Sequence, residues 1–262
     1  MSKAFERQLA ARKELEEIWR HPEQVNVIHY SCESFYDRPD GSSPRITSIA
    51  VRNLKTGQTR SFSIHKYGEI KGLKANELSD HYNELEREML DAFAALCRDQ
   101  KEYRWLHWNM RDENYGFNAI ELRHRILAGE PFSIQDDRKL DLSRILVGIF
   151  GKAYIGHPRL ESLMTKNKIS SKNFKTGAEE AQAFVDGNYV GLHQSTLAKV
   201  DILASLCQLS FEGGLKTNAG WKDVHGHSAK AAINWFANNP YIAFAITIVS
   251  LLANVAFIFG IF

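Results

Sequence analysis

The sequence predicts an α/β fold with a mixed sheet, in which an antiparallel three-strand meander is followed by parallel strands and flanking helices. Three β-rich segments follow one another near the N-terminus and are joined by turn-rich connections. An aromatic strand and several helices with one apolar face come next. Because a strand reached across a helix usually runs parallel to its predecessor, this order favours a mixed sheet.

The N-terminal half predicts one helix and the meander. A charged segment, Ser2 to Arg20, carries an apolar stripe at helical spacing and ends at His21-Pro22. Three strands are predicted at residues 25–32, 45–53 and 59–65. The last two are separated by the tight turn at residues 55–57, which indicates a hairpin.

The C-terminal half predicts one more strand among helices. The strand covers residues 103–109, and helices are expected at residues 77–99, 117–127, 140–150, 159–166, 176–186 and 195–209. The first helix has apolar residues at steps of three and four, which places them on one face. Thr176 and Glu179 have the spacing of a capping box, so a helix should begin after Thr176.

The final residues predict a membrane anchor. Residues 231–262 carry no charge, and the run from Pro240 to Phe262 would be about 34 Å long as a helix, enough for a bilayer core of about 30 Å. Lys216, Lys222 and Lys230 precede it, so the positive-inside rule predicts a tail-anchored, single-pass protein with a cytoplasmic domain. Asn254 indicates either self-association through the membrane helix or a single amide tolerated near one end of the span.

These features divide the chain into four parts. We expect an N-terminal helix at residues 1–22, an α/β domain at 23–210, a linker at 211–231 and a transmembrane anchor at 232–262 that contacts the lipid bilayer. The net charge of +2 gives no overall basic field that would require nucleic acid. The three cysteines are far apart, which indicates neither a disulfide framework nor a metal-binding spacing.

Several local segments resemble one enzyme family. Four segments are similar to motifs of ribonuclease H-like proteins, in particular the four-acid (DEDD-type) 3′–5′ exonucleases. They are Val27-Ile-His-Tyr-Ser-Cys-Glu-Ser-Phe35, the strand Arg45 to Val51, the segment Leu106 to Glu113 and the helix Leu197 to Leu203. The resemblance covers about residues 24–210 by the order of elements. It implies a ribonuclease H-like fold and a nuclease that acts on or binds nucleic acid.

The resemblance also implies a metal site. In this family, carboxylates from separate elements hold two Mg²⁺ or Mn²⁺ ions that activate water for phosphodiester cleavage. The matching positions are Glu33, Asp112 or its substitute Glu113, and Asp201, with Glu33, Asp112 and Asp201 as metal ligands. The sequence departs from the pattern at Ser31, where the family has an aspartate, and it lacks the basic residue that usually precedes the last acid.

Two functions therefore remain open from the sequence. One is a membrane-tethered, metal-dependent nuclease. The other is a catalytically degenerate binding or assembly module whose membrane helix is the effector or the scaffold contact. The polar cluster of His107, Asn109, Asp112, Glu113 and His124 marks a strand end where a ligand could bind, or a packed strand followed by a solvated turn.

Overall fold

Five strands form one mixed sheet in the order β3-β2-β1-β4-β5. The computed structural model describes residues 3–34, 43–111, 115–170, 172–220, 223, 241, 244 and 247–251. Antiparallel pairs join β1 to β2 and β2 to β3, whereas β1, β4 and β5 are parallel. The strands are β1 (Val25–Cys32), β2 (Ile46–Asn53), β3 (Thr59–Ser63), β4 (Arg104–His107) and β5 (Lys139–Asp141).

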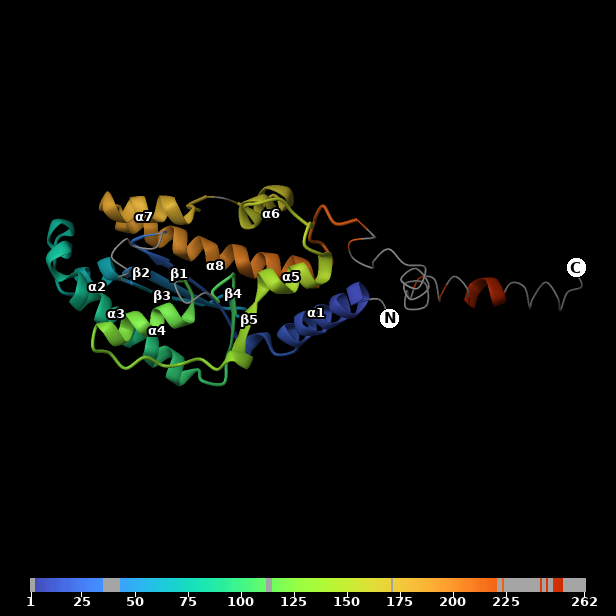
Figure 1. Cartoon of the computed structure of the whole chain (residues 1–262), viewed down its shortest axis with the longest axis horizontal. Helices are drawn as coiled ribbons and strands as arrows, with labels where there is room; N and C mark the ends of the chain where they lie inside the picture. Colours follow the sequence, from blue (N-terminus) through green and yellow to red (C-terminus); the bar gives the residue numbers. More distant parts are fainter. Residues whose placement is uncertain are drawn as a thin grey trace, which may run out of the picture.

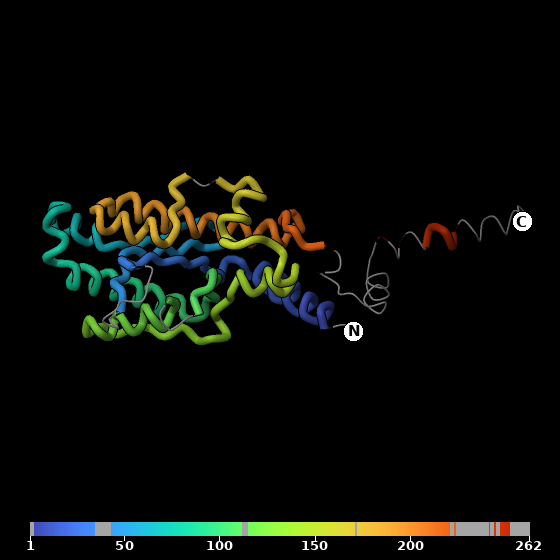
Figure 2. The backbone as a smooth tube through the Cα atoms, turned by 45° about the horizontal axis from the view of Figure 1, so that its top comes forward, coloured from blue at the N-terminus to red at the C-terminus, as the bar shows by residue number. Residues whose placement is uncertain are grey.

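Helices cover both faces of the sheet (Figures 1 and 2). In Figure 1, α7 and α8 lie above the sheet and α3 and α4 lie below it. Contacts of α8 with β1 and β2, and of α3 with β2 and β3, agree with this arrangement. The helices are α1 (Lys3–Arg20), α2 (Ile64–Ile70), α3 (Leu78–Asp99), α4 (Phe117–Ile126), α5 (Leu142–Phe150), α6 (Arg159–Asn167), α7 (Gly177–Val185) and α8 (Tyr189–Phe211).

The central strand β1 contributes to two apolar cores. Val25 and Val27 pack into the core formed with α1, α5 and α8, whereas Ile28 and Tyr30 pack into the core formed with α3. All four are fully buried. Alternation along a strand explains why neighbours face opposite cores, and each buried aliphatic side chain contributes about 1.5–3 kcal/mol to folding.

The packing of α1 on α5 depends on one glycine. A Cβ atom at Gly148 would lie 2.5 Å from the Cβ of Ala11, so only glycine permits this approach of the two helices. The Nε of Arg7 also donates to the carbonyl of Gly148 over 3.2 Å. The predicted N-terminal helix is therefore confirmed, and it is held against the domain.

The register of β1 and β2 shifts near the end of β1. Ser31 pairs with Ser48, but Cys32 pairs with Ile46, which indicates a β-bulge between Ser31 and Cys32. A bulge changes the direction of the side chains that follow it. It therefore affects where Glu33, the next residue, points.

Most predicted elements are confirmed, and three are wrong in part. The last helix, predicted from Ser195, begins six residues earlier, at Tyr189. The predicted third strand ends at Ser63, because α2 begins at Ile64. The helix predicted from Leu140 begins at Leu142, because Lys139 to Asp141 form β5.

The predicted anchor, residues 232–262, lies outside the described residues except at 241, 244 and 247–251. Within the part of the chain that the structure describes, no helix is long and apolar enough to cross a membrane.

Candidate functional site

Glu33 and Asp201 lie at opposite ends of β1. Glu33 follows the bulge, and its carboxylate accepts from the backbone amide of Arg45 over 3.0 Å and pairs with its guanidinium over 2.6 Å. Asp201 pairs with Arg52 over 3.1 Å, and Arg52 stands close to the first residues of β1, opposite Val27. The structure does not bring these two predicted metal ligands together, and each carboxylate already has an arginine partner.

The direction of Asp201 follows from helix geometry. Lys199 of α8 is buried and faces the sheet. Asp201 comes two residues later, and two residues rotate a side chain by about 200° around an α-helix. Asp201 consequently projects outward, with a side chain that is 60% exposed. The residue of α8 that faces the predicted site is therefore Lys199 rather than Asp201.

The other two predicted acids, Asp112 and Glu113, lie outside the described residues. Among the residues that are described, no group of three or more His, Cys, Asp or Glu side chains could hold a metal ion. Glu33 and Asp201 do not fit one divalent-ion site, because they occupy separate positions and are bound by arginines.

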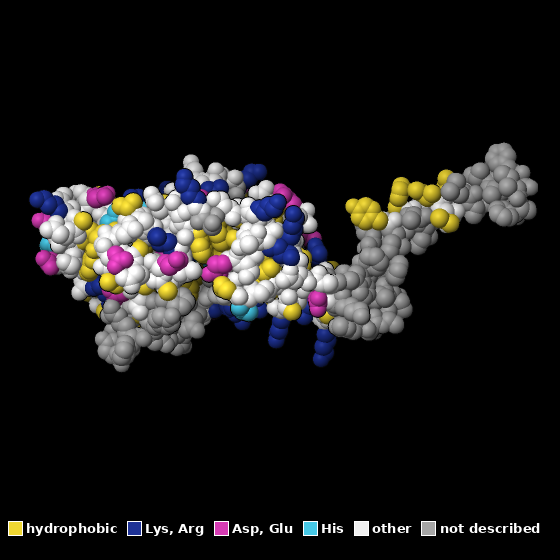
Figure 3. All heavy atoms as spheres, turned by 90° about the horizontal axis from the view of Figure 1, so that it is seen from above, with side chains coloured by type: hydrophobic (Ala, Val, Ile, Leu, Met, Phe, Trp, Pro, Cys, Tyr) yellow, Lys and Arg dark blue, Asp and Glu magenta, His cyan; other side chains and the backbone are white. Residues whose placement is uncertain are grey.

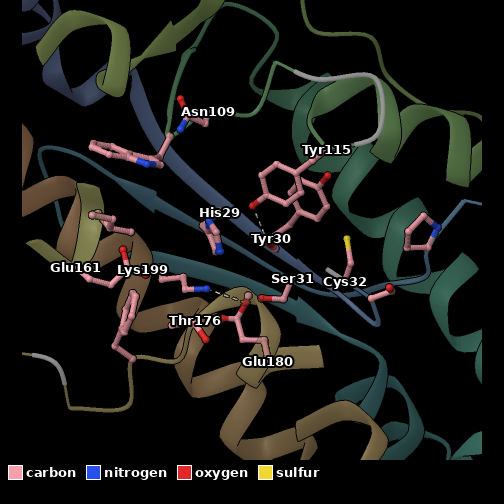
Figure 4. A pocket seen from close by; sticks show the side chains of 16 residues that line it. His29, Tyr30, Ser31, Cys32, Asn109, Tyr115, Glu161, Thr176, Glu180 and Lys199 are labelled. Atoms are coloured by element: carbon pink, nitrogen blue, oxygen red, sulfur yellow. Dashed lines mark hydrogen bonds and ion pairs between the residues drawn. The ribbon is translucent and has the colours of Figure 1, made fainter. Parts of the chain in front are cut away.

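A cavity of about 520 Å³ lies where β1 and β4 end at their carboxyl edge. We call it the central cavity and define it by its main lining residues. These are His29 to Cys32 of β1, Trp108 and Asn109 after β4, Tyr115 before α4, Glu161 of α6, Phe174 and Thr176 before α7, Gly177 and Glu180 of α7, and Lys199 of α8. Figure 4 shows His29 and Ser31 of β1 on the side of the strand that faces Lys199 and Glu180. Ligands of α/β proteins commonly bind at this edge of a sheet.

The polar floor of the central cavity is formed by His29, Lys199 and Glu180. Figure 4 shows His29 from β1 and Lys199 from α8 pointing toward one another. The Nζ of Lys199 pairs with Glu180 over 2.7 Å, and both side chains are almost completely buried. The second oxygen of Glu180 accepts from Ser195 over 2.7 Å. This carboxylate is therefore satisfied by the protein itself.

His29 has a ring nitrogen in the central cavity whose hydrogen-bonding capacity is not satisfied by the described residues. Its ring is nine-tenths buried, and its Nε2 has no hydrogen-bond partner among the described residues. Burial, followed by the charge of Lys199, holds the pKa of His29 well below its usual value. The ring is consequently neutral at pH 7, and Nε2 can form one hydrogen bond to a ligand.

Aromatic side chains form the remaining walls. Trp108 and Phe174 are half-buried, and Lys199 lies 5.5 Å from the Phe174 ring. Tyr115 stacks on Tyr30 with ring centroids 4.7 Å apart, and its hydroxyl donates to the Tyr30 carbonyl. These contacts fix the Tyr115 ring beside the cavity. Flat apolar walls with a few polar groups suit a planar ligand.

Asn109 joins the central cavity to the loop after β4. Its backbone is left-handed, with φ of 55°, a conformation that asparagine tolerates better than most residues. Its Oδ1 accepts from Arg111 over 2.7 Å. The predicted strand-end cluster is thus divided, because Asn109 lines the cavity while His124 is buried on α4 against Asp91.

The cavity offers poor nucleophiles. The Oγ of Ser31 is engaged with the hydroxyl of Thr196 over 2.9 Å. Burial, together with the nearby charge of Glu86, raises the pKa of the Cys32 thiol far above its usual value. A thiol held in this way does not form the reactive thiolate. The arrangement is therefore better suited to binding than to covalent catalysis.

No family model, curated protein or solved structure matches the chain. The functional interpretation consequently depends on the site itself. Sequence reasoning missed Lys199, Glu180 and Glu161, which line the cavity. One signal was present for Glu180: it follows the capping box of α7, so its place in the first turn could be assigned. Its partnership with Lys199 depends on how α7 packs against α8.

Proposed function

We propose that this chain is a ribonuclease H-like domain that binds nucleic acid through the central cavity, without metal-dependent cleavage, and is held to the cytoplasmic face of a membrane by residues 232–262. The fold assignment is supported by the order of elements, with an antiparallel meander, parallel β4 and β5, and α8 packed across β1 and β2. The membrane assignment is supported by the uncharged run and the lysines before it.

One observation carries the proposal. On the first strand, after the fourth strand and on the last helix, the elements that carry the family's carboxylates, the described residues His29, Asn109 and Lys199 line the cavity, whereas Glu33 and Asp201 do not. Two carboxylates, Glu161 and Glu180, line the cavity, and they do not form part of a group of three or more acidic, histidine or cysteine side chains that could hold a metal ion among the described residues. Its buried glutamate, Glu180, is neutralised by Lys199.

The aromatic walls favour a nucleobase as the bound group. Trp108, Phe174 and Tyr115 provide ring faces, and stacking of one base on an aromatic side chain contributes about 1–3 kcal/mol. The Nε2 of His29 and the amide of Asn109 can form hydrogen bonds with a base edge. The cavity volume of about 520 Å³ lies within the range of small-ligand sites. The unpaired bases of single strands can enter such a cavity.

The test is binding of a fluorescein-labelled hexanucleotide to the full chain in a nonionic detergent, measured by fluorescence anisotropy in EDTA. Trp108→Leu should weaken binding at least fivefold, because one stacking wall is lost. Phe62→Leu, which alters a half-buried aromatic residue against α3, is the matched control and should not change the affinity. Equal losses in both variants would argue against the central cavity as the site.

The same preparation tests the nuclease interpretation. We expect no cleavage of single- or double-stranded DNA or RNA in Mg²⁺ or Mn²⁺. Cleavage that is abolished by both Glu33→Ala and Asp201→Ala would instead establish a metal-dependent nuclease, and our proposal would then be wrong.

A further inference from the structure

A second cavity of about 390 Å³ lies beside the central cavity, at the carboxyl ends of β4 and β5. We call it the edge cavity and define it by six of its lining residues: His107, Arg111, Asn118, Lys139, Asp141 and Arg144. The two cavities meet at one hydrogen bond, because Asn109 lines the first, Arg111 lines the second, and Nη2 of Arg111 donates to Oδ1 of Asn109 over 2.7 Å.

Among the described residues that line the edge cavity, cations outnumber available acids. Arg111, Lys139 and Arg144 face Asp141 and Asp136. Asp141 is already used: it pairs with Nε of Arg111 over 2.5 Å and caps α5 by accepting from the amide of Arg144. Asp136 pairs with Lys139 but is 97% exposed, and such surface pairs contribute little. A positive charge therefore remains for an anion.

Arg144 is the cation with the greatest freedom to bind. Its side chain is exposed, and its guanidinium forms no hydrogen bond or ion pair with the described residues. An arginine fork can bind two oxygens of one phosphate at once. Arg144 is thus available to a ligand without the loss of a structural contact.

Two further groups in the edge cavity are suited to donate to an anion. His107 is 99% buried, and its Nδ1 accepts from the amide of Met110 over 3.2 Å, which leaves the proton on Nε2. This Nε2 has no hydrogen-bond partner within the described residues. The helix α4 begins at the cavity with Phe117 and Asn118, and its N-cap residue, Gly116, provides no side-chain cap. An uncapped helix start attracts negative charge.

We propose that the edge cavity binds a phosphate group of the nucleic acid whose base occupies the central cavity. This inference rests on the proposed function and adds the position of the backbone. The link between Asn109 and Arg111 places the phosphate site next to the base site, as in one nucleotide unit. On the α6–α8 face, by contrast, acidic and basic side chains are intermixed (Figure 3).

The experiment compares Arg144→Gln with Arg60→Gln in the full chain in detergent. Both variants remove one exposed arginine, but Arg60 lies on β3, at the sheet edge opposite β5. Three probes are titrated: a fluorescein-labelled hexanucleotide, adenosine and inorganic phosphate. Arg144→Gln should weaken hexanucleotide binding at least fivefold and reduce the slope of log K against log salt by about 0.7. Arg144→Gln should leave adenosine binding unchanged. Arg60→Gln should change neither hexanucleotide binding nor adenosine binding.

Each other outcome separates the two proposals. Equal hexanucleotide losses in both variants, or an equal loss of adenosine binding in Arg144→Gln, would overturn the phosphate site. If adenosine binds but the hexanucleotide binds no more tightly, the central cavity is supported and the phosphate site is overturned. If inorganic phosphate binds through Arg144 but neither adenosine nor the hexanucleotide does, the edge cavity is a site for free phosphate and the proposed function fails.

Discussion

His29 shows how a single residue can lower stability while providing a binding group. Its Nε2 is buried without a partner, and an unsatisfied buried polar atom costs about 1–3 kcal/mol. The neighbouring Lys199 and Glu180 satisfy one another and do not relieve it. A ligand that forms this hydrogen bond recovers the cost, so the group favours the bound state.

We therefore predict that His29→Leu separates stability from binding. The free energy of unfolding should rise by about 1 kcal/mol, because the unsatisfied nitrogen is removed. Affinity for the hexanucleotide should fall about 3- to 10-fold through loss of one hydrogen bond. Urea unfolding and anisotropy measure the two quantities. His81→Leu, at a partly exposed histidine on α3, is the control for binding. An unchanged affinity in His29→Leu would exclude His29 from the site.

His193 makes stability dependent on pH. Its Nδ1 bonds Ser48 over 2.7 Å and its Nε2 bonds Ser61 over 3.1 Å, in a buried position beside His65. Burial, then the charges of His65 and Lys66, lowers the pKa of His193 to about 4. Because the folded pKa lies below the unfolded value of about 6.5, the stabilisation is complete above pH 6.5 and is lost as pH falls toward 4.

We predict that a fall in pH destabilises the His193→Gln variant less than it destabilises the unmodified chain. Between pH 7 and pH 4.5, this variant should lose about 2–3 kcal/mol less unfolding free energy than the unmodified chain, because glutamine does not titrate. Denaturant unfolding at several pH values gives the comparison. An identical pH dependence of the two proteins would show that His193 is not protonated on unfolding.

At the same scale, the sequence identified the right helix but not the right residue. The segment Leu197 to Leu203 was expected to carry a site residue, and its Lys199 lines the central cavity. Asp201 was chosen because its residue type suits a metal, yet its side chain points away from the sheet. The face that α8 turns toward the sheet cannot be read from its sequence, because α8 has low amphipathicity and is buried on several sides.

At the scale of elements, a buried charge network connects α3, α4 and the start of β2. Glu86 of α3 is fully buried and forms two hydrogen bonds with Arg123 of α4, at 2.9 and 2.8 Å. It also accepts from the amide of Ile46 over 2.7 Å and lies near Arg45. Glu33 joins through Arg45, so this predicted metal ligand has a structural role in the described residues.

Removal of Glu86 should therefore be costly. We predict that Glu86→Ala lowers the free energy of unfolding by about 3–5 kcal/mol, because Arg123 is left without its buried partner. Glu84→Ala is the matched control on the same helix. Its ion pair with Lys71 is on the surface, so its loss should destabilise the fold far less than the loss of Glu86. Thermal unfolding of both variants gives the difference, and similar costs would contradict the network.

Short elements account for two of the errors in the predicted secondary structure, at the end of β3 and the start of α5. The strand β5 has three residues and continues directly into α5, so its apolar residue was taken for the start of a helix. The helix α2 has seven residues, and its N-cap residue, Ser63, forms no side-chain cap. Neither element is long enough for periodicity to show. The long elements α1, β1 and α3 were predicted almost to the residue.

At the scale of the whole molecule, the mixed sheet was predictable because its topology follows from the order of strands and helices. The cavities were not, because their walls come from segments far apart in the chain. The membrane anchor remains a prediction of the sequence. It depends on the length and lack of charge of residues 232–262.

The predicted membrane anchor can be tested by introducing charged residues into it. Val249→Arg together with Leu252→Arg should release the full chain from membranes in high salt, because each arginine at the centre of a span costs about 2.5–3.5 kcal/mol. Glu212→Arg together with Asn218→Arg adds two arginines at exposed positions before the run and should leave the protein membrane-bound. Flotation of both double variants gives the answer, and equal flotation would contradict an anchor in this segment.

The central position of β1 also has a consequence for the order of folding. Its pairing with β2 closes a short loop, whereas its pairing with β4 must wait until α2 and α3 have been traversed. Short loops close at a lower entropic cost, and non-local pairing slows folding. We therefore expect the meander to form early and the cavity between β1, α7 and α8 to close late. During refolding, the ability to bind a ligand in this cavity should appear after most of the secondary structure has formed.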